Sequence, residues 1–221
     1  MYYSNTKKKA KDKSIFSMSK VLDGIYHLSF DSTINLGAYF LRYQEYYESP
    51  RYYNVPFQLI DFLKWYASEN DGNFTYFSDW AGFNLPAQVI LDLYPQLTDA
   101  NDHDSFMLLI AKMVLKENDK AYIIGTSHES KSALDHEIAH GLFYTNTKYQ
   151  AEMKRTVKKL PAKIRKGIES VLLEMGYHER VLVDEIQAYM ATGVSDRMKV
   201  PSKYQGPFRK VFYKYYQPMP A

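Results

Sequence analysis

With 221 residues, 46% of them hydrophobic, and a formal net charge of +3, the chain is expected to fold as one globular domain with a sizeable core. It contains no cysteine, which excludes disulfides, thiolate metal sites and a cysteine nucleophile, so any zinc ion must be bound by histidine and carboxylate side chains. The net charge is too small to argue for nucleic acid, and no apolar run approaches the length of a membrane span.

Residues 1–20 predict a flexible basic extension, followed by a single domain over residues 21–221. The lysines between positions 7 and 13 could contact phosphates, but a solvated tail explains them better. The segment lacks the apolar core of a signal peptide, which favours a cytoplasmic location and leaves export by a signal-independent route open.

The first half of the chain is predicted to be mostly helical. Alternation of apolar and polar residues predicts a strand over 25–30, and the segment 73–86 is rich in aromatic residues and turn residues. Its Phe74, Tyr76 and Trp80 could line a substrate groove, but a strand and loop packed against the core explain them better. The predicted helices span 34–48, 57–67, 87–93 and 106–116.

An acidic cluster of Asp102, His103 and Asp104 could bind a metal ion. Three residues that are adjacent in sequence cannot all face one ion from a regular element. We therefore expect Asp102 or Asp104 to cap the helix that follows.

A strand, a polar loop and a helix are predicted in succession between residues 121 and 144. Residues 121–125 are apolar and end in a glycine, as in a short buried strand. Ser132, with Asp135 three residues later, predicts the N-terminal cap of the helix. One face of the helix is apolar, with Leu134, Ile138 and Leu142.

The same helix carries the sequence His136-Glu137-Ile138-Ala139-His140, an H-E-x-x-H motif whose two histidines point away from the apolar face. Residues four apart lie one turn above each other on a helix, so two imidazoles so placed can reach one zinc ion. The intervening glutamate then lies beside the remaining coordination position, where it can take a proton from a zinc-bound water. The alternative is a pair of surface or capping histidines on an ordinary amphipathic helix.

The rest of the chain is predicted to be helical up to residue 193. Helices are expected over 148–160, 161–175 and 177–193, and the lysines and arginine near residue 155 form a solvated face of the first of them. The final segment, 200–221, is basic and aromatic and could bind a partner or nucleic acid. It lacks any recognised motif, so we expect it to pack on the domain.

A zinc site with two histidines needs a third protein ligand. Glu185 is the preferred candidate because Asp184 and Glu185 lie within an apolar helix, where a carboxylate is costly unless it is paired or bound to a metal. The alternatives that remain open are Asp184, Glu174, Glu152 and His178.

The HEIAHG sequence of residues 136–141, followed by a later helix with a glutamate, resembles the zincin metallopeptidases of the gluzincin branch. The sequence DEIQAYMA of residues 184–191 also resembles the glutamate helix of small regulatory metallopeptidases that cleave repressor proteins. The resemblance covers residues 121–193. It implies an α+β fold, a mostly helical zincin-like domain with a small sheet next to the H-E-x-x-H helix, with Glu185 as the third zinc ligand.

Three departures from related patterns bear on this resemblance. A metzincin would have glycine and histidine at the positions of Phe143 and Asn146, which makes that branch a poor match. Gluzincins often have an aspartate four residues after the glutamate ligand, where this chain has Tyr189. The spacing from His140 to Glu185 is longer than in compact members and leaves room for two helices.

The function implied is zinc-dependent hydrolysis of a peptide bond in a peptide or protein substrate, with Glu137 as the general base. His178 and Tyr189 are the leading candidates for stabilising the oxyanion, and Tyr144 is a third. The strand 121–125 is expected to form the rim of the cleft, where an extended substrate could add as a strand.

Two other functional classes remain open. One is a zincin-like protein that binds metal without turnover and acts as a protein-binding module, and the other is a helical interaction protein without metal. The oligomeric state and the substrate sequence are not predicted.

Overall fold

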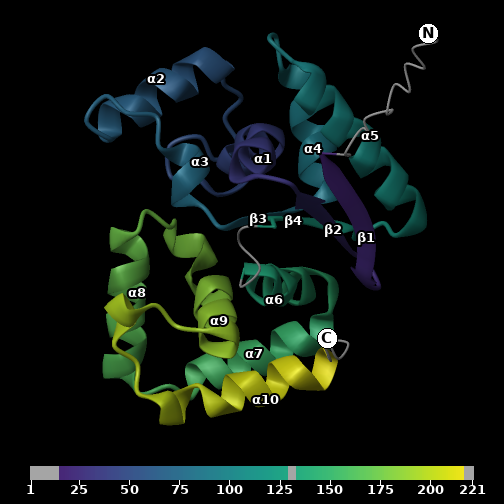
Figure 1. Ribbon diagram of the computed structural model, residues 1–221. Coiled ribbons are helices and arrows are strands. Elements are labelled where there is room, and N and C mark those ends of the chain that lie inside the picture. Colours follow the sequence, from purple (N-terminus) through teal and green to yellow (C-terminus); the bar gives the residue numbers. More distant parts are fainter. Residues whose placement is uncertain (1–14, 129–132, 217–221) are drawn as a thin grey trace, which may run out of the picture.

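The computed structural model describes residues 15–128 and 133–216, which form a mixed α+β fold with a small four-stranded sheet between two layers of helices (Figure 1). The strands are β1 (Phe16–Leu22), β2 (Ile25–Phe30), β3 (Gly82–Pro86) and β4 (Tyr122–Ser127). The layer above the sheet contains α1 (Thr33–Glu48), α2 (Leu59–Glu69), α3 (Tyr76–Asp79), α4 (Ala87–Leu93) and α5 (Asp102–Glu117). The layer below contains α6 (Leu134–Thr145), α7 (Thr147–Lys158), α8 (Ala162–Glu174), α9 (Leu182–Thr192) and α10 (Gly206–Tyr215).

The sheet is mixed, with strand order β1-β2-β4-β3. β1 pairs antiparallel with β2, β2 pairs parallel with β4, and β3 pairs antiparallel with β4. β4 therefore lies inside the sheet and all of its residues are buried. The expectation that strand 121–125 forms the rim of the cleft is wrong, because β3 takes the edge position beside it.

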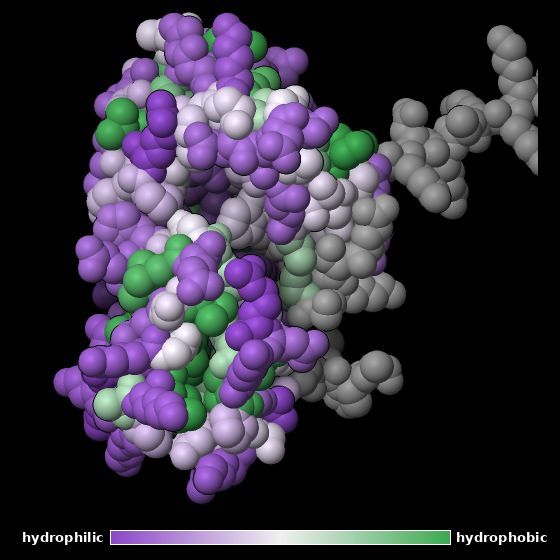
Figure 2. All heavy atoms as spheres, turned by 90° about the vertical axis from the view of Figure 1, so that its left-hand side faces the viewer, coloured by the Kyte–Doolittle hydropathy of each residue, from purple (hydrophilic) through white to green (hydrophobic). Residues whose placement is uncertain are grey.

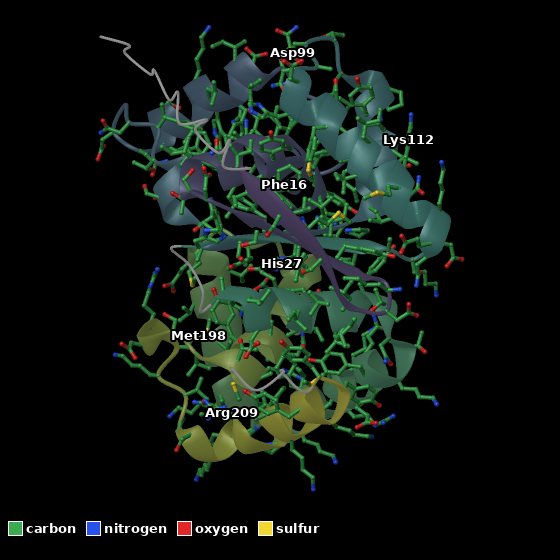
Figure 3. The ribbon with its side chains drawn as sticks, turned by 45° about the vertical axis from the view of Figure 1, so that its right-hand side comes forward. Phe16, His27, Asp99, Lys112, Met198 and Arg209 are labelled. Carbon is green, nitrogen blue, oxygen red and sulfur yellow. The ribbon has the colours of Figure 1, made fainter. Side chains whose placement is uncertain are left out.

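Each face of the sheet covers its own hydrophobic core. In β2, Tyr26 and Leu28 belong to the core above the sheet, while Ile25 belongs to the core below. Figure 3 shows the same division, with Phe16 on the upper side of the sheet and His27 on the lower side. The alternation of side chains along a strand thus assigns the two helical layers to opposite faces.

The first helix lies directly on the sheet because β4 has a glycine beneath it. A Cβ atom added to Gly125 would lie 2.5 Å from Phe40 Cε2 and 2.8 Å from Leu36 Cδ1. Leu36 and Phe40 are fully buried side chains of α1, so neither can move into open space. Gly125 therefore sets the distance between α1 and the sheet.

Replacing Gly125 by alanine is expected to destabilise the fold by about 1–3 kcal/mol, because the added methyl group overpacks the α1 contact. Gly167 provides the control, since no atom lies within 4 Å of its added Cβ and it occupies the interior of α8. Gly167→Ala should stabilise the chain by up to about 1 kcal/mol through helix propensity. Urea unfolding measures the change in unfolding free energy for each substitution. Equal changes for Gly125→Ala and Gly167→Ala would contradict the packing argument.

Most elements predicted from periodicity are confirmed, including the strand 25–30 and the helices predicted between residues 34 and 175, whereas the helix predicted over 177–193 begins only at Leu182. Asp104 caps α5 as expected, in a capping box with Asn101. β1 begins at Phe16 and so includes the end of the segment expected to be an extension. Residues 1–14 and the expected cap Ser132 lie outside the described residues.

The described part of the C-terminal segment, up to residue 216, packs on the domain as expected, mainly through a helix. α10 buries Phe208 and Phe212 in the lower core against α7 and α9. Among the described residues, no helix combines the length and the apolar character needed to cross a membrane.

Candidate metal centre

The helix α6 carries the H-E-x-x-H motif against the lower face of the sheet. Ile138 and Leu142 are buried in the lower core, as the apolar stripe predicted. Gly141 lies so close to β2 that an added Cβ would be 2.9 Å from Ile25 Cδ1. This close contact lets α6 pack directly beneath the sheet, and the imidazoles of His136 and His140 point toward α9.

The two imidazoles converge with the carboxylate of Glu185, which α9 supplies from the other side. The Nε2 atoms of His136 and His140 are 3.2 Å apart; Glu185 Oε1 lies 3.6 Å from His140 Nε2, and Glu185 Oε2 lies 3.8 Å from His136 Nε2. A tetrahedral ion with bonds of about 2.0–2.1 Å holds its ligand atoms roughly 3.3–3.5 Å apart. The two imidazole nitrogens are close to this spacing, one atom from each of the three residues lies within 4.8 Å of the others, and the group could hold a metal ion.

The other ring nitrogens have partners outside the centre. His140 Nδ1 lies 3.0 Å from Asp184 Oδ1, which can only accept, so Nδ1 carries the proton. Thr192 donates its hydroxyl proton to Ala188 O and can therefore accept from His136 Nδ1 at 3.4 Å. With both Nδ1 atoms held by partners outside the centre, both Nε2 atoms face inward at hydrogen-bond distance from each other, and a cation bound between them would replace that contact.

The carboxylate of Glu185 also fits a metal ligand. It is 2% exposed, and its Oε2 is buried without a hydrogen-bond partner. Burial raises the pKa of Glu185 well above its ordinary value, and the neighbouring His140 opposes this shift. A buried carboxylate oxygen with no donor is costly, and a metal ion supplies the missing interaction.

The charges around the two histidines differ in their effect. Burial lowers the pKa of His136 well below its ordinary value. Burial acts in the same direction on His140, but the carboxylates of Asp184 and Glu185 outweigh it and hold its pKa well above the ordinary value. The centre is therefore negatively polarised on the side of α9, which favours a cation.

Glu137 points from α6 toward the edge strand β3. Its Oε2 accepts a hydrogen bond from Asn84 Nδ2 at 2.7 Å, and Asn84 in turn accepts from the Tyr122 hydroxyl. Burial raises the pKa of Glu137 to about 7, against the opposing effects of His140 and Asn84. The carboxylate is thus held at one oxygen and has a pKa suited to proton transfer near neutral pH.

Close approach of Glu137 to the strand depends on a glycine. A Cβ added to Gly82 would lie 2.4 Å from Glu137 Oε1 and 2.8 Å from its Cδ. Asn84 and Gly82 belong to the segment 73–86, whose aromatic residues alone suggested a groove. Because strand pairing brings this segment to α6 from more than fifty residues away, nothing in the local sequence indicates these two contacts.

A buried glutamine supports the centre from behind. Gln187 Nε2 donates to Asp184 Oδ1 at 3.0 Å and to Ala139 O at 3.2 Å, and its Oε1 accepts from the Tyr149 hydroxyl at 2.7 Å. Gln187 is fully buried. It joins α9 to α6 and α7 and orients Asp184, which orients His140. A glutamine among the apolar residues of α9 is the sequence signal that could have identified this role.

A cleft of about 490 Å³ gives access to His136 and Glu137. Its walls come from residues 79–82, the turn after α8, and the end of α9. Figure 2 views the molecule from this side, where the surface is hollowed between the upper and lower layers.

Two tyrosines lie at the wall of the cleft. The ring of Tyr189 packs edge-on against His136, with the ring centres 4.6 Å apart, and its hydroxyl lies 3.2 Å from that of Tyr177. Both residues line the cleft. Tyr189 was expected near the centre from the sequence, whereas Tyr177 was not singled out.

Two predicted oxyanion donors are not brought to this cleft. His178 was expected on the same helix as Glu185, which is wrong, because α9 begins only at Leu182 and His178 caps the preceding turn through Arg180 N. Tyr144 packs on Tyr122 with ring centres 5.1 Å apart. Neither His178 nor Tyr144 is among the residues that line the cleft.

The alternatives for the third ligand are placed elsewhere. Glu152 accepts from Lys214 Nζ and the Tyr215 hydroxyl, and Glu174 is an exposed residue of α8. Asp184 contacts the outer nitrogen of His140 rather than the inner one. Of the candidates from the sequence, Glu185 is the one whose carboxylate faces both Nε2 atoms.

Comparison with known proteins gives no relative from which a role could be transferred. No protein-family model, no curated protein and no solved structure matches the chain. The chemistry of the centre must therefore be argued from its own residues.

Proposed function

We propose that the protein is a zinc-dependent peptidase of the gluzincin type. The observation that carries the proposal is the convergence of His136, His140 and Glu185 on one point beside Glu137. Two imidazoles and one carboxylate are a ligand set typical of catalytic zinc, which keeps its fourth position for water or substrate. The absence of cysteine is consistent with this set.

Bound zinc would lower the pKa of a water molecule and polarise the substrate carbonyl. Glu137 would accept the proton of the attacking water and later deliver it to the leaving amine. Asn84 holds one of its carboxylate oxygens, so the other is left for proton transfer. The pKa of about 7, which results mainly from burial, allows Glu137 to act in both directions near neutral pH.

The hydroxyls of Tyr177 and Tyr189 are the candidates for a donor to the developing oxyanion. They lie 3.2 Å apart at the wall of the cleft, so one of them can donate to substrate while the other holds it in place. An extended substrate can approach along the edge strand β3, which ends the sheet beside Glu137.

Replacing Glu137 by glutamine is the direct test, because it keeps the shape of the side chain and removes the proton acceptor. Zinc content should stay at about one ion per chain, while cleavage of a peptide library should fall by at least the roughly 10²–10⁴-fold typical of general base catalysis. Mass spectrometry of the digested library measures the new peptide ends, with the chelated parent as the baseline.

Cleavage by Glu137→Gln at the parental rate would reject the assigned mechanism. If the parent binds zinc and cleaves nothing across the library, the protein is a binding module with a zincin-like centre. If the folded chain binds no zinc, both the peptidase and the zinc-containing binding module are rejected.

Replacing Gly82 by alanine is expected to displace the Glu137 carboxylate, because the new methyl group would lie 2.4 Å from its Oε1. Cleavage should fall at least about tenfold while zinc content and unfolding temperature change little, since misplaced catalytic groups act poorly. Gly72→Ala is unsuitable as a control because Gly72 has a positive φ of 83°. Gly206→Ala has open space and should retain parental cleavage.

A further inference from the structure

A second cavity, of about 220 Å³, adjoins the cleft. It lies between α1, α2, β3 and the turn after α8, and it shares Trp80, Gly82, Met175 and Tyr177 with the cleft. Gly82 is in contact with Glu137. The cavity therefore opens beside the group that we propose as the general base.

Two carboxylates from α1 line this cavity, Glu45 and Glu48. Glu45 accepts from the Tyr76 hydroxyl at 2.9 Å, and Glu48 accepts from Gln44 Nε2 at 2.7 Å. Within residues 15–128 and 133–216, neither carboxylate has a lysine or arginine nitrogen within 4 Å. Two acids on one wall of a cavity, neither in a direct ion pair with a lysine or arginine of the described residues, form an acidic recess that a cation can enter.

Burial makes these charges costly in the empty cavity. It raises the pKa of Glu45 to about 7, against the hydrogen bond from Tyr76. Burial also raises the pKa of Glu48 to about 8, against the opposing charge of His140. A cation that entered the cavity would stabilise both carboxylates in their charged form.

The remaining wall is aromatic. Trp65 and Tyr66 from α2 line it together with Trp80 and Tyr177. Aromatic faces attract ammonium and guanidinium groups and also pack against the alkyl stem of lysine or arginine. The cavity volume of about 220 Å³ exceeds the roughly 150 Å³ of a cavity that holds benzene. It is smaller than the roughly 300 Å³ at which small-molecule sites begin. The cavity is therefore of a size that suits one amino-acid side chain.

We propose that this cavity binds a lysine or arginine side chain of the substrate, at a residue next to the scissile bond. The proposal rests on the proposed peptidase function, since the cavity opens beside Glu137. It assigns Glu45 and Glu48 to recognition of the positive charge and the aromatic wall to recognition of the alkyl stem. The enzyme would then cleave beside basic residues.

The test compares acetylated hexapeptide libraries that carry either lysine or norleucine at one fixed position. Norleucine has a similar alkyl chain and lacks the ammonium group. The ratio of the values measured for the lysine and norleucine libraries therefore reports the contribution of the charge alone. Equilibrium binding is measured on the zinc-loaded Glu137→Gln chain, which does not depend on turnover, and kcat/KM is measured on the parent. We expect a lysine preference of at least about tenfold in both measurements.

Replacing Glu48 by glutamine should reduce this preference to within about threefold of unity. Glu45→Gln is the second variant, and it should also reduce the lysine preference. It replaces Glu48→Gln in the test if that chain does not fold. Glu69→Gln removes the same charge from an exposed position of α2 and should leave the preference unchanged.

Equal or tighter binding of norleucine peptides by the Glu137→Gln chain would overturn the proposal, as would a lysine preference that survives both glutamine variants. The two proposals fail separately. A lysine preference in binding that Glu48→Gln abolishes, without cleavage by the parent, would support the basic-side-chain cavity and reject the peptidase.

Discussion

Zinc is expected to raise the unfolding temperature of the metal-free chain by several degrees. Its ligands His136, His140 and Glu185 are held together only by the folded packing of α6 against α9, so zinc binds the folded state in preference to the unfolded state. At free zinc about a thousand times the Kd, the gain is about 4 kcal/mol. For a chain of this size that corresponds to roughly 8–16 °C. Differential scanning calorimetry with and without zinc measures the shift.

His140→Ala should abolish this shift and reduce bound zinc from about one ion per chain to a small fraction. His178→Ala is the matched control, because it makes the same chemical change at a histidine that caps a turn outside the cleft. A zinc-dependent shift of equal size in the two variants would contradict the assignment of His140, and no shift in the parent would contradict the metal centre itself.

The three proposed metal ligands could be predicted from the sequence, because each follows from a local pattern. The four-residue spacing of His136 and His140 dictates a shared helix face once the apolar stripe fixes the orientation of α6. Glu185 was identified because a carboxylate in an apolar helix needs a partner. The choice between Asp184 and Glu185 depends on the rotation of α9, which the packing of Ile186 and Met190 determines.

The contacts that position Glu137 could not be predicted from local pattern. Asn84 and Gly82 reach α6 only because β3 pairs with β4, and strand pairing over such a separation depends on the whole fold. The same dependence explains why β4 was expected at the rim. The apolar residues 121–124 at its start indicate burial on both faces, which suits the interior position that β4 has.

The placement of His178 shows how a helix boundary alters a site. Counting residues back from Glu185 along a continuous helix places His178 two turns away on a similar face. The positive φ of Gly176 ends the preceding segment, and a short 3-10 turn, η3 (Glu179–Val181), comes before α9. Tyr177 and Tyr189 instead meet at the cleft, because the chain folds back at that turn.

The last prediction separates the ligand on α9 from the residue that orients a ligand. Glu185→Gln keeps the shape of the side chain and removes the charge that faces both Nε2 atoms, so zinc affinity should fall by more than a hundredfold. Asp184→Asn leaves an oxygen that can still accept from His140 Nδ1. The loss of zinc affinity in Asp184→Asn should therefore stay within the roughly 10–100-fold typical of residues that orient metal ligands. Competition titration with a fluorescent zinc chelator measures both, with exposed Glu174→Gln as the control.

Although Glu185→Gln should lower the affinity for zinc, it should not lower the stability of the metal-free chain. Glu185 Oε2 is buried without a hydrogen-bond partner, and burial raises the pKa of Glu185 well above its ordinary value, so an uncharged amide of the same shape avoids the cost of ionising a buried carboxyl group. Metal-free Glu185→Gln should therefore unfold at the same urea concentration as the metal-free parent or a higher one, although it binds zinc far more weakly. A variant that loses zinc together with its fold would not identify a ligand. If Asp184→Asn lost more zinc affinity than Glu185→Gln, the roles of the two acids would be exchanged.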